Sequence, residues 1–99
     1  MYDQILGQLI NRNTKIKISK EQEKDLGKSI LTSIPFGDFY AIIDLLRGHD
    51  VGNVENKLIS LLRDSIKRNF AQLKKEFPEK DRELFGKILG EFVNRKKTS

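Results

Sequence analysis

The single histidine, His49, and its acidic neighbours are the first candidates for chemistry in this chain. Asp50 follows it directly and Asp44 lies about one helical turn before it, so the group could supply a general base or metal ligands. A metal site usually needs three or four convergent ligands, and the sequence has no cysteine and no second imidazole to join them. A histidine beside the negative end of a helix is also favourably placed without any ligand. We therefore expect a loop histidine, with no metal and no cofactor.

Carboxylates form the second group of candidates for chemistry. They are Glu76, Glu79, Asp81 and Glu83. Acidic side chains are expected near the start of a helix, and paired-carboxylate catalysis needs two of them facing each other in a cleft. The sequence also lacks the Gly-x-Ser-x-Gly turn of serine hydrolases and a glycine loop that could cradle phosphate. These absences predict a protein that is not an enzyme and has no small-molecule substrate.

Basic side chains indicate a different class of function. The net charge of +5 lies entirely in residues 51 to 99, which hold twelve basic and seven acidic side chains, whereas residues 1 to 50 hold seven of each. Clustered lysine and arginine attract phosphate, although they can equally serve only to keep a surface solvated. The candidate nucleic-acid contacts in this half are Arg63, Lys67, Arg68, Lys74, Lys75, Arg95, Lys96 and Lys97. Because no exposed aromatic residue is expected among them, we expect contacts to phosphate rather than to bases.

Lys15 and Lys17 are two further candidates for contacts to nucleic acid. They alternate with Ile16 and Ile18 in residues 14 to 18, a pattern typical of a short strand with the lysines on one face. A strand followed by two helices resembles a ribbon-helix-helix repressor over residues 14 to 47. The resemblance implies lysines at the bases of the major groove and isoleucines in the core. The sequence departs from that family at the loop around Pro35 and in its roughly fifty additional helical residues.

Gly86 and Gly90 form a third feature, because both fall inside a predicted helix. Each glycine costs about 1 kcal/mol relative to alanine in a helix interior, so some contact should offset that cost. Their spacing of four residues creates a flat strip where another helix can approach closely. The partner is either a helix of this chain or one of another molecule.

Two helices and the strand occupy the first third of the chain. Apolar residues from Tyr2 to Ile10 recur at helical intervals, and this helix should end near residues 11 to 13. Ser19 and Gln22 fit a capping box that starts a second helix at Lys20. That helix should stop by Ile34, because the residue before a proline leaves the helical region.

Three further helices should follow. Asp38 is expected to cap a short helix over residues 39 to 46 that is apolar on nearly every side, which makes it our candidate for the buried centre. Gly48 should end that helix in a left-handed conformation, and Asn53 should cap the long helix over residues 54 to 77. After Pro78, apolar residues from Leu84 to Val93 define the last helix.

The sequence therefore predicts an all-α, single-domain bundle of about five helices over residues 1 to 99. The long helix, about 36 Å at 1.5 Å per residue, must span or leave a domain whose radius of gyration is near 13 Å. It is covered either by a second copy or by the first two helices and the last one. Phe36, Phe39 and Tyr40 are expected in the core, but if exposed they could anchor a contact.

These features favour a small non-catalytic interaction or adaptor protein that binds a protein partner or its own copy. The alternative is a nucleic-acid-binding regulator that uses the basic half. The longest apolar runs fall well short of the roughly 18 residues that a membrane span requires, and the start of the chain lacks the features of a signal peptide. We therefore expect a cytoplasmic protein without membrane contact.

Overall fold

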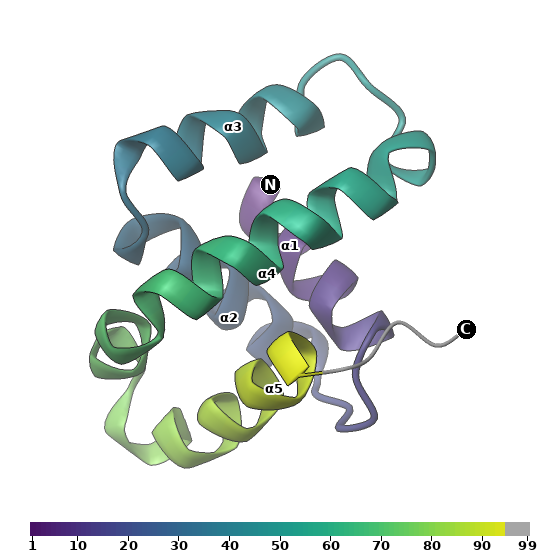
Figure 1. Cartoon of the computed structure of the whole chain (residues 1–99). Helices are drawn as coiled ribbons and strands as arrows, with labels where there is room; N and C mark the ends of the chain where they lie inside the picture. The colour runs from purple at the N-terminus through teal and green to yellow at the C-terminus, as the bar shows by residue number, and fades with distance from the viewer. Residues whose placement is uncertain (95–99) are drawn as a thin grey trace.

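A computed structural model describes residues 1–94, which form an all-α bundle, as the sequence predicts (Figure 1). Its elements are α1 (Tyr2–Arg12), α2 (Lys20–Ser33), α3 (Phe36–Leu46), α4 (Val51–Glu76), the 3-10 turn η1 (Glu79–Asp81) and α5 (Arg82–Asn94). The longest helix, α4, crosses the middle of the molecule, with α3 along one side, α5 on the other, and α1 and α2 behind it. This arrangement places two helix pairs, α3–α4 and α4–α5, on one face.

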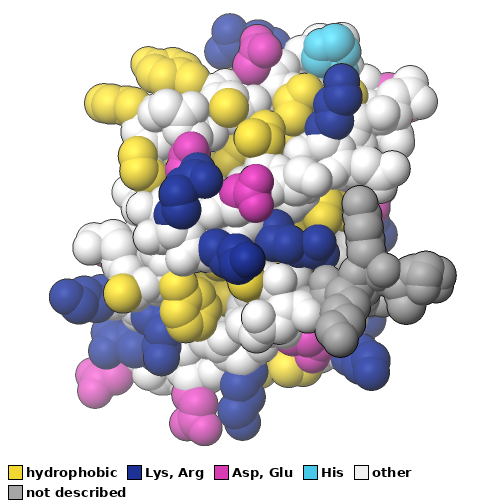
Figure 2. Space-filling view, in the orientation of Figure 1, with side chains coloured by type: hydrophobic (Ala, Val, Ile, Leu, Met, Phe, Trp, Pro, Cys, Tyr) yellow, Lys and Arg dark blue, Asp and Glu magenta, His cyan; other side chains and the backbone are white. Residues whose placement is uncertain are grey.

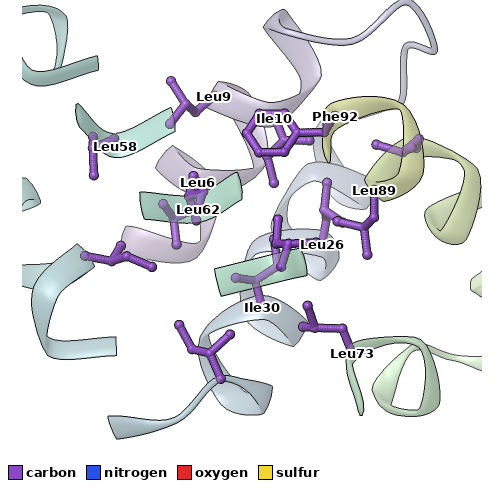
Figure 3. Packing of buried hydrophobic residues seen from close by; sticks show 14 of the residues in the cluster. Leu6, Leu9, Ile10, Leu26, Ile30, Leu58, Leu62, Leu73, Leu89 and Phe92 are labelled. Atoms are coloured by element: carbon purple, nitrogen blue, oxygen red, sulfur yellow. The ribbon is translucent and has the colours of Figure 1, made fainter. Parts of the chain in front are cut away.

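The core is built from the apolar stripes of all five helices (Figure 3). Its fully buried residues include Leu6, Leu9, Ile10, Leu26, Ile30, Ile42, Leu58, Leu62, Ile66, Leu73, Phe85, Ile88, Leu89 and Phe92. At the turn between α4 and α5, the rings of Phe77 and Phe85 meet edge to face, with their centroids 4.9 Å apart. Such pairs stabilise a core beyond the area they bury, and this one fixes the angle at which α5 returns along α4.

The α1–α2 pair is the tightest helix contact of the fold, and two glycines make it possible. Gly7 and Gly27 are both buried. A Cβ atom on Gly7 would overlap the backbone carbonyl of Glu23, and one on Gly27 would overlap that of Asp3. The contact is thus reciprocal, with each glycine packed against the residue four positions before the other. In the sequence, Leu-Gly occurs inside both helices, at residues 6–7 and 26–27, but this repeated dipeptide alone does not predict the contact.

The predicted strand at residues 14–18 is wrong, since no strand occurs in residues 1–94. The segment is a loop held by the side chain of Asn11, whose Nδ2 donates to the Ile18 carbonyl at 3.1 Å and whose Oδ1 accepts from the Ile18 N–H at 3.3 Å. One amide therefore satisfies the backbone groups that a partner strand would pair. The alternation of side chains was read correctly, because Ile16 and Ile18 pack against the core while Lys15 and Lys17 are exposed.

Helix ends agree with the sequence where a side chain caps them. At the start of α2, Ser19 Oγ accepts from the Gln22 N–H at 3.2 Å and Gln22 Oε1 accepts from the Ser19 N–H at 3.0 Å, which confirms the capping box. Gly48 adopts φ 72°, a left-handed conformation that suits glycine, as predicted.

Two predicted N-caps are wrong. The helix expected from Phe39, with Asp38 as its N-cap, begins three residues earlier, at Phe36, with Pro35 as its N-cap. The long helix begins at Val51 rather than after Asn53, because the Asp50 carboxylate accepts from the Gly52 N–H at 3.2 Å. Asp50 lies three residues before Asn53 and its side chain caps the backbone first, so the helix begins at Val51.

The long helix α4 is kinked and covered within the chain. Asn69 has non-helical dihedrals (φ −116°, ψ 20°), and its Nδ2 donates to the Ser65 carbonyl at 2.8 Å, which bends the last two turns. The described chain measures 35 × 32 × 25 Å, so α4 spans the domain and does not leave it. Because α1, α2, α3 and α5 all contact α4, the cover that we considered from a second copy comes from this chain itself.

Candidate functional site

The residues first considered for catalysis do not assemble. Asp50 is engaged as the cap of α4, while His49 and Asp44 are both exposed. Within residues 1–94, no three histidine, aspartate or glutamate side chains lie close enough to hold a metal ion. The functional candidates of this structure are therefore surfaces, and two of them stand out.

The first surface is the α3 face, which lies along the outer side of α3 and the adjoining part of α4. It consists of Phe36, Tyr40, Ala41, Asp44 and Leu45 of α3 with Asn56, Lys57, Ser60 and Leu61 of α4. A shallow groove runs between the two helices, lined by Ala41, Leu45 and Leu61 among others. In the space-filling view, a group of hydrophobic side chains is exposed at the upper left, over the start of α3 (Figure 2).

Two aromatic rings dominate the α3 face. Phe36 is 76% exposed and Tyr40 is 63% exposed. The two rings stack one helical turn apart, with their centroids 5.7 Å apart and an interplanar angle of 21°. Phe39, half-buried beneath them, meets Tyr40 edge to face. The expectation that these aromatic residues lie in the core is therefore wrong for Phe36 and Tyr40.

The position of α3 explains why these rings are exposed. This helix is apolar on nearly every side, but it packs mainly on α4 and buries only Ile42, Ile43 and Leu46. A helix at the edge of a bundle can bury one side, so its other apolar side remains at the surface. The prediction that α3 forms the buried centre is wrong for this reason, and the centre is formed by α4.

Asp38 fastens α3 to α4. Its carboxylate accepts hydrogen bonds from Arg68 Nη2 at 2.8 Å to each oxygen and from Ser65 Oγ at 3.0 Å. The Arg68 guanidinium, followed by the Ser65 hydroxyl, holds the pKa of Asp38 below its ordinary value of 3.8, against the opposing effect of burial. Asp38 thus ties the aromatic end of α3 to the middle of α4.

The basic residues predicted to form one face of α4 divide between its two neighbours. Arg68 turns toward α3 and binds Asp38. Arg63 turns toward α5, where its Nε donates to the Phe92 carbonyl at 3.2 Å and its guanidinium lies 5.6 Å from the Phe92 ring centroid. Both arginines therefore hold helices together. Lys67, Lys74 and Lys75 remain exposed.

The second surface is the α4–α5 groove, a name we give to two depressions that meet where Lys74 lies over Phe70. One is lined by Lys67, Phe70 and Gly90, and the other by Lys74, Gly86 and Lys87. Val93 and Asn94 line one end of it, and Glu79, Arg82 and Glu83 line the other. Lys74 Nζ lies 5.7 Å from the centroid of the Phe70 ring, which is half-buried between the lysines. Lysine and arginine side chains gather over α4 and α5 on this face (Figure 2).

Gly86 and Gly90 line this groove without making the helix contact that we considered within the chain. Among residues 1–94, a Cβ atom on Gly90 would meet nothing within 4 Å, and one on Gly86 would meet only Lys74 Cε, at 3.6 Å. Packing against another helix of the described chain is therefore not their role. Contact with another molecule stays a prediction.

The remaining predicted contacts do not join either surface. Lys15 and Lys17 lie on the loop before α2, where Lys17 Nζ donates to the Asn11 carbonyl at 2.5 Å and the Lys15 N–H donates to the Glu91 carboxylate. Without a strand there is no ribbon to enter a major groove, so the resemblance to ribbon-helix-helix repressors is not supported by the fold. Arg95, Lys96 and Lys97 lie outside the described residues.

Sequence reasoning missed the α3 face and the place of Phe70 in the α4–α5 groove. Phe36 and Tyr40 are four residues apart, and this spacing marks one helix face. That signal was available, but the apolar residues around it made a buried helix equally consistent with the pattern. Phe70 belongs to the apolar stripe of α4, and the sequence gives no sign that its ring is only half-buried, beside Gly90 of α5.

Comparisons of the chain with models of protein families, with curated proteins and with solved structures found no match. In the part of the chain that the structure describes, none of the helices combines the length and the apolar character that crossing a membrane requires.

Proposed function

We propose that this protein is a non-catalytic interaction protein that pairs with a second copy of itself through the α3 face. The observation that supports this proposal is the exposed, stacked pair of Phe36 and Tyr40 beside an apolar groove. Aromatic side chains are enriched at the centres of protein interfaces, where they contribute more to affinity than other residues. Most of the surface of each ring lies in water on a single chain, so this exposed area does not stabilise the fold.

The two rings also account for a useful part of an interface. An aromatic side chain can bury about 150–250 Å², and a standard interface buries roughly 800 Å² on each partner. Given the exposed fractions of Phe36 and Tyr40, these residues supply about a third of that area. The neighbouring groove residues, among them Leu45 and Leu61, extend the apolar surface.

Charge favours a second copy as the partner. The α3 face carries an exposed acid, Asp44, and an exposed base, Lys57, on opposite sides of its groove. In a two-fold pair the same surface meets itself, so an acid of one copy can lie opposite a base of the other, twice per dimer. A partner of uniform charge would find one of these two groups unfavourable.

Removing the rings should dissociate the dimer. We expect sedimentation equilibrium to find a dimer at micromolar concentration, and the double variant Phe36→Gln, Tyr40→Gln to raise the dissociation constant about 30-fold or more. Both changes occur twice in a two-fold dimer, which multiplies their effect. The control is Gln8→Ala. Gln8 is an exposed residue of α1 outside the α3 face, so this change should leave the dimer unchanged. An 11.5 kDa monomer for the native chain across this range would contradict the proposal.

A charge exchange identifies the occupant as a second copy. Asp44→Lys alone and Lys57→Asp alone should each weaken self-association, because each places like charges opposite one another. An equal mixture of the two variants should associate again, since a mixed dimer restores both attractive pairs. Recovery upon mixing arises only between molecules, so a mixture that stays monomeric excludes this arrangement of the dimer.

A further inference from the structure

We propose that the α4–α5 groove binds the phosphate backbone of a single-stranded nucleic acid without reading its sequence. This site lies apart from the α3 face and adds a second binding activity to the proposed function. Three observations support it: the lysines are weakly paired with carboxylates, the groove is open, and an aromatic ring lies in it.

The lysines of the groove are available to a ligand. In residues 1–94, Lys67 has no carboxylate within 4.0 Å, and Lys74 rests on the Phe70 ring rather than on an acid. Lys87 has one partner there, Glu83 at 3.7 Å, and both of these side chains are largely exposed. Exposed pairs of this kind contribute little, so a phosphate can replace the carboxylate at small cost. The arginines nearby, in contrast, are used for packing.

The shape of the groove suits one strand. The depressions that form the groove are open to solvent, so an extended single backbone can lie along them. Gly86 and Gly90 leave the α5 side of this groove open, because neither carries a side chain and, in the described chain, only the flexible end of Lys74 lies near Gly86. On α4 the groove extends from Lys67 to Lys74, about two turns or roughly 10 Å at 1.5 Å per residue.

The aromatic residue favours nucleic acid over an acidic protein. Lys67 and Lys74 lie two turns apart on α4, with the half-buried ring of Phe70 between them. This arrangement matches a nucleic acid, in which each unit carries a phosphate and a base. The two lysines can bind phosphates, and a base can stack on the aromatic ring between them. A glutamate-rich peptide would satisfy the lysines but not the ring.

A salt titration tests the site. We would follow the anisotropy of a labelled, mixed-sequence single strand as native protein is added at several salt concentrations. Neutralising Z phosphates of a single strand gives a slope of log K against log salt near −0.7Z. The triple variant Lys67→Gln, Lys74→Gln, Lys87→Gln should therefore flatten the slope by about 2 and weaken binding about tenfold or more at low salt.

The matched control removes the same charge elsewhere. Lys20→Gln, Lys24→Gln, Lys28→Gln lowers the net charge equally on exposed positions of α2 and should leave the slope nearly unchanged. Circular dichroism should show both triple variants to be folded. An equal effect of the two triple variants would overturn the site, as would equal affinity for a duplex or for polyglutamate of the same charge. Failure here leaves the α3 face unaffected, since none of these substitutions lies on it.

Discussion

Gly7 and Gly90 are both helical glycines, yet their environments predict opposite effects of the same substitution. At Gly7 an added methyl group would enter the backbone of Glu23, so Gly7→Ala must push α1 and α2 apart and should lower the free energy of unfolding by about 2 kcal/mol or more. At Gly90 it would meet no atom of the described residues within 4 Å, so Gly90→Ala should raise that free energy by about 0.5–1 kcal/mol. Urea denaturation of the two variants measures both values.

The contrast between these glycines also bears on the α4–α5 groove. If folding alone had selected the residue at position 90, alanine would serve better, so the glycine is consistent with use of the groove by a ligand. Gly27→Ala is the matched control for Gly7→Ala, because the contact is reciprocal and its Cβ would enter the backbone of Asp3. A Gly90→Ala variant less stable than the native chain would refute the open environment at this position.

Asp38 gives the stability of the protein a dependence on pH. Its pKa is lower in the folded chain than its ordinary value of 3.8, so the bonds to Arg68 and Ser65 stabilise the fold fully above that value. This contribution should be lost as the pH falls through 3.8 toward the lowered pKa of the folded state. Asp38→Asn should cost about 1 kcal/mol at pH 7, discounted for the exposure of Arg68, and progressively less as the pH falls toward the lowered pKa of Asp38.

The pH profile distinguishes this role from a general loss of packing. Urea denaturation of the native chain and of Asp38→Asn at pH 7, 4 and 2 should give free energies of unfolding that converge as the pH falls. A constant difference across this range would mean that the charge of Asp38 is not what ties α3 to α4.

At the scale of elements, the sequence predicted the five helices well because apolar residues at helical spacing must share a face. Ends were predicted where the capping signal was complete, as at Ser19 with Gln22. They were wrong where a lone acidic or amide side chain was assigned as a cap. Asp38 had a better partner in Arg68, thirty residues away, and Asn53 was preceded by Asp50, which caps first. The partner of Asp38 depends on the folded arrangement, whereas Asp50 was a second cap signal already present in the local sequence.

Placement of the helices was less predictable than their existence. The most apolar segment, α3, was expected at the centre, but a helix that is apolar all round can also lie at an edge and leave one side for a partner. The basic residues of α4 do not form the single solvated face that the sequence predicted, because Arg63 contacts α5 and Arg68 contacts α3. Their division into two packing arginines and the exposed lysines depends on which helix lies on each side, and the sequence of α4 does not contain that information.

Considered as a whole, the molecule separates its two proposed surfaces along α4. The α3 face uses Lys57 and Leu61 near the start of this helix, whereas the α4–α5 groove uses Lys67 and Lys74 nearer its end. A two-fold dimer through the α3 face therefore leaves the groove of each copy uncovered. Such a dimer would present two grooves to one strand.

Two grooves on one dimer should make binding depend on the length of the strand. A strand long enough to reach both grooves binds the second one intramolecularly, which can raise the overall affinity about a hundredfold or more without any new contact. We expect the affinity of the native chain to rise stepwise in a series of single strands of increasing length, measured at protein concentrations that favour the dimer. The double variant Phe36→Gln, Tyr40→Gln keeps its groove but should lose this step, because a monomer offers one groove to each strand. A step of the same size in that variant would show that length acts through a single groove, and would separate the proposed dimer from nucleic-acid binding.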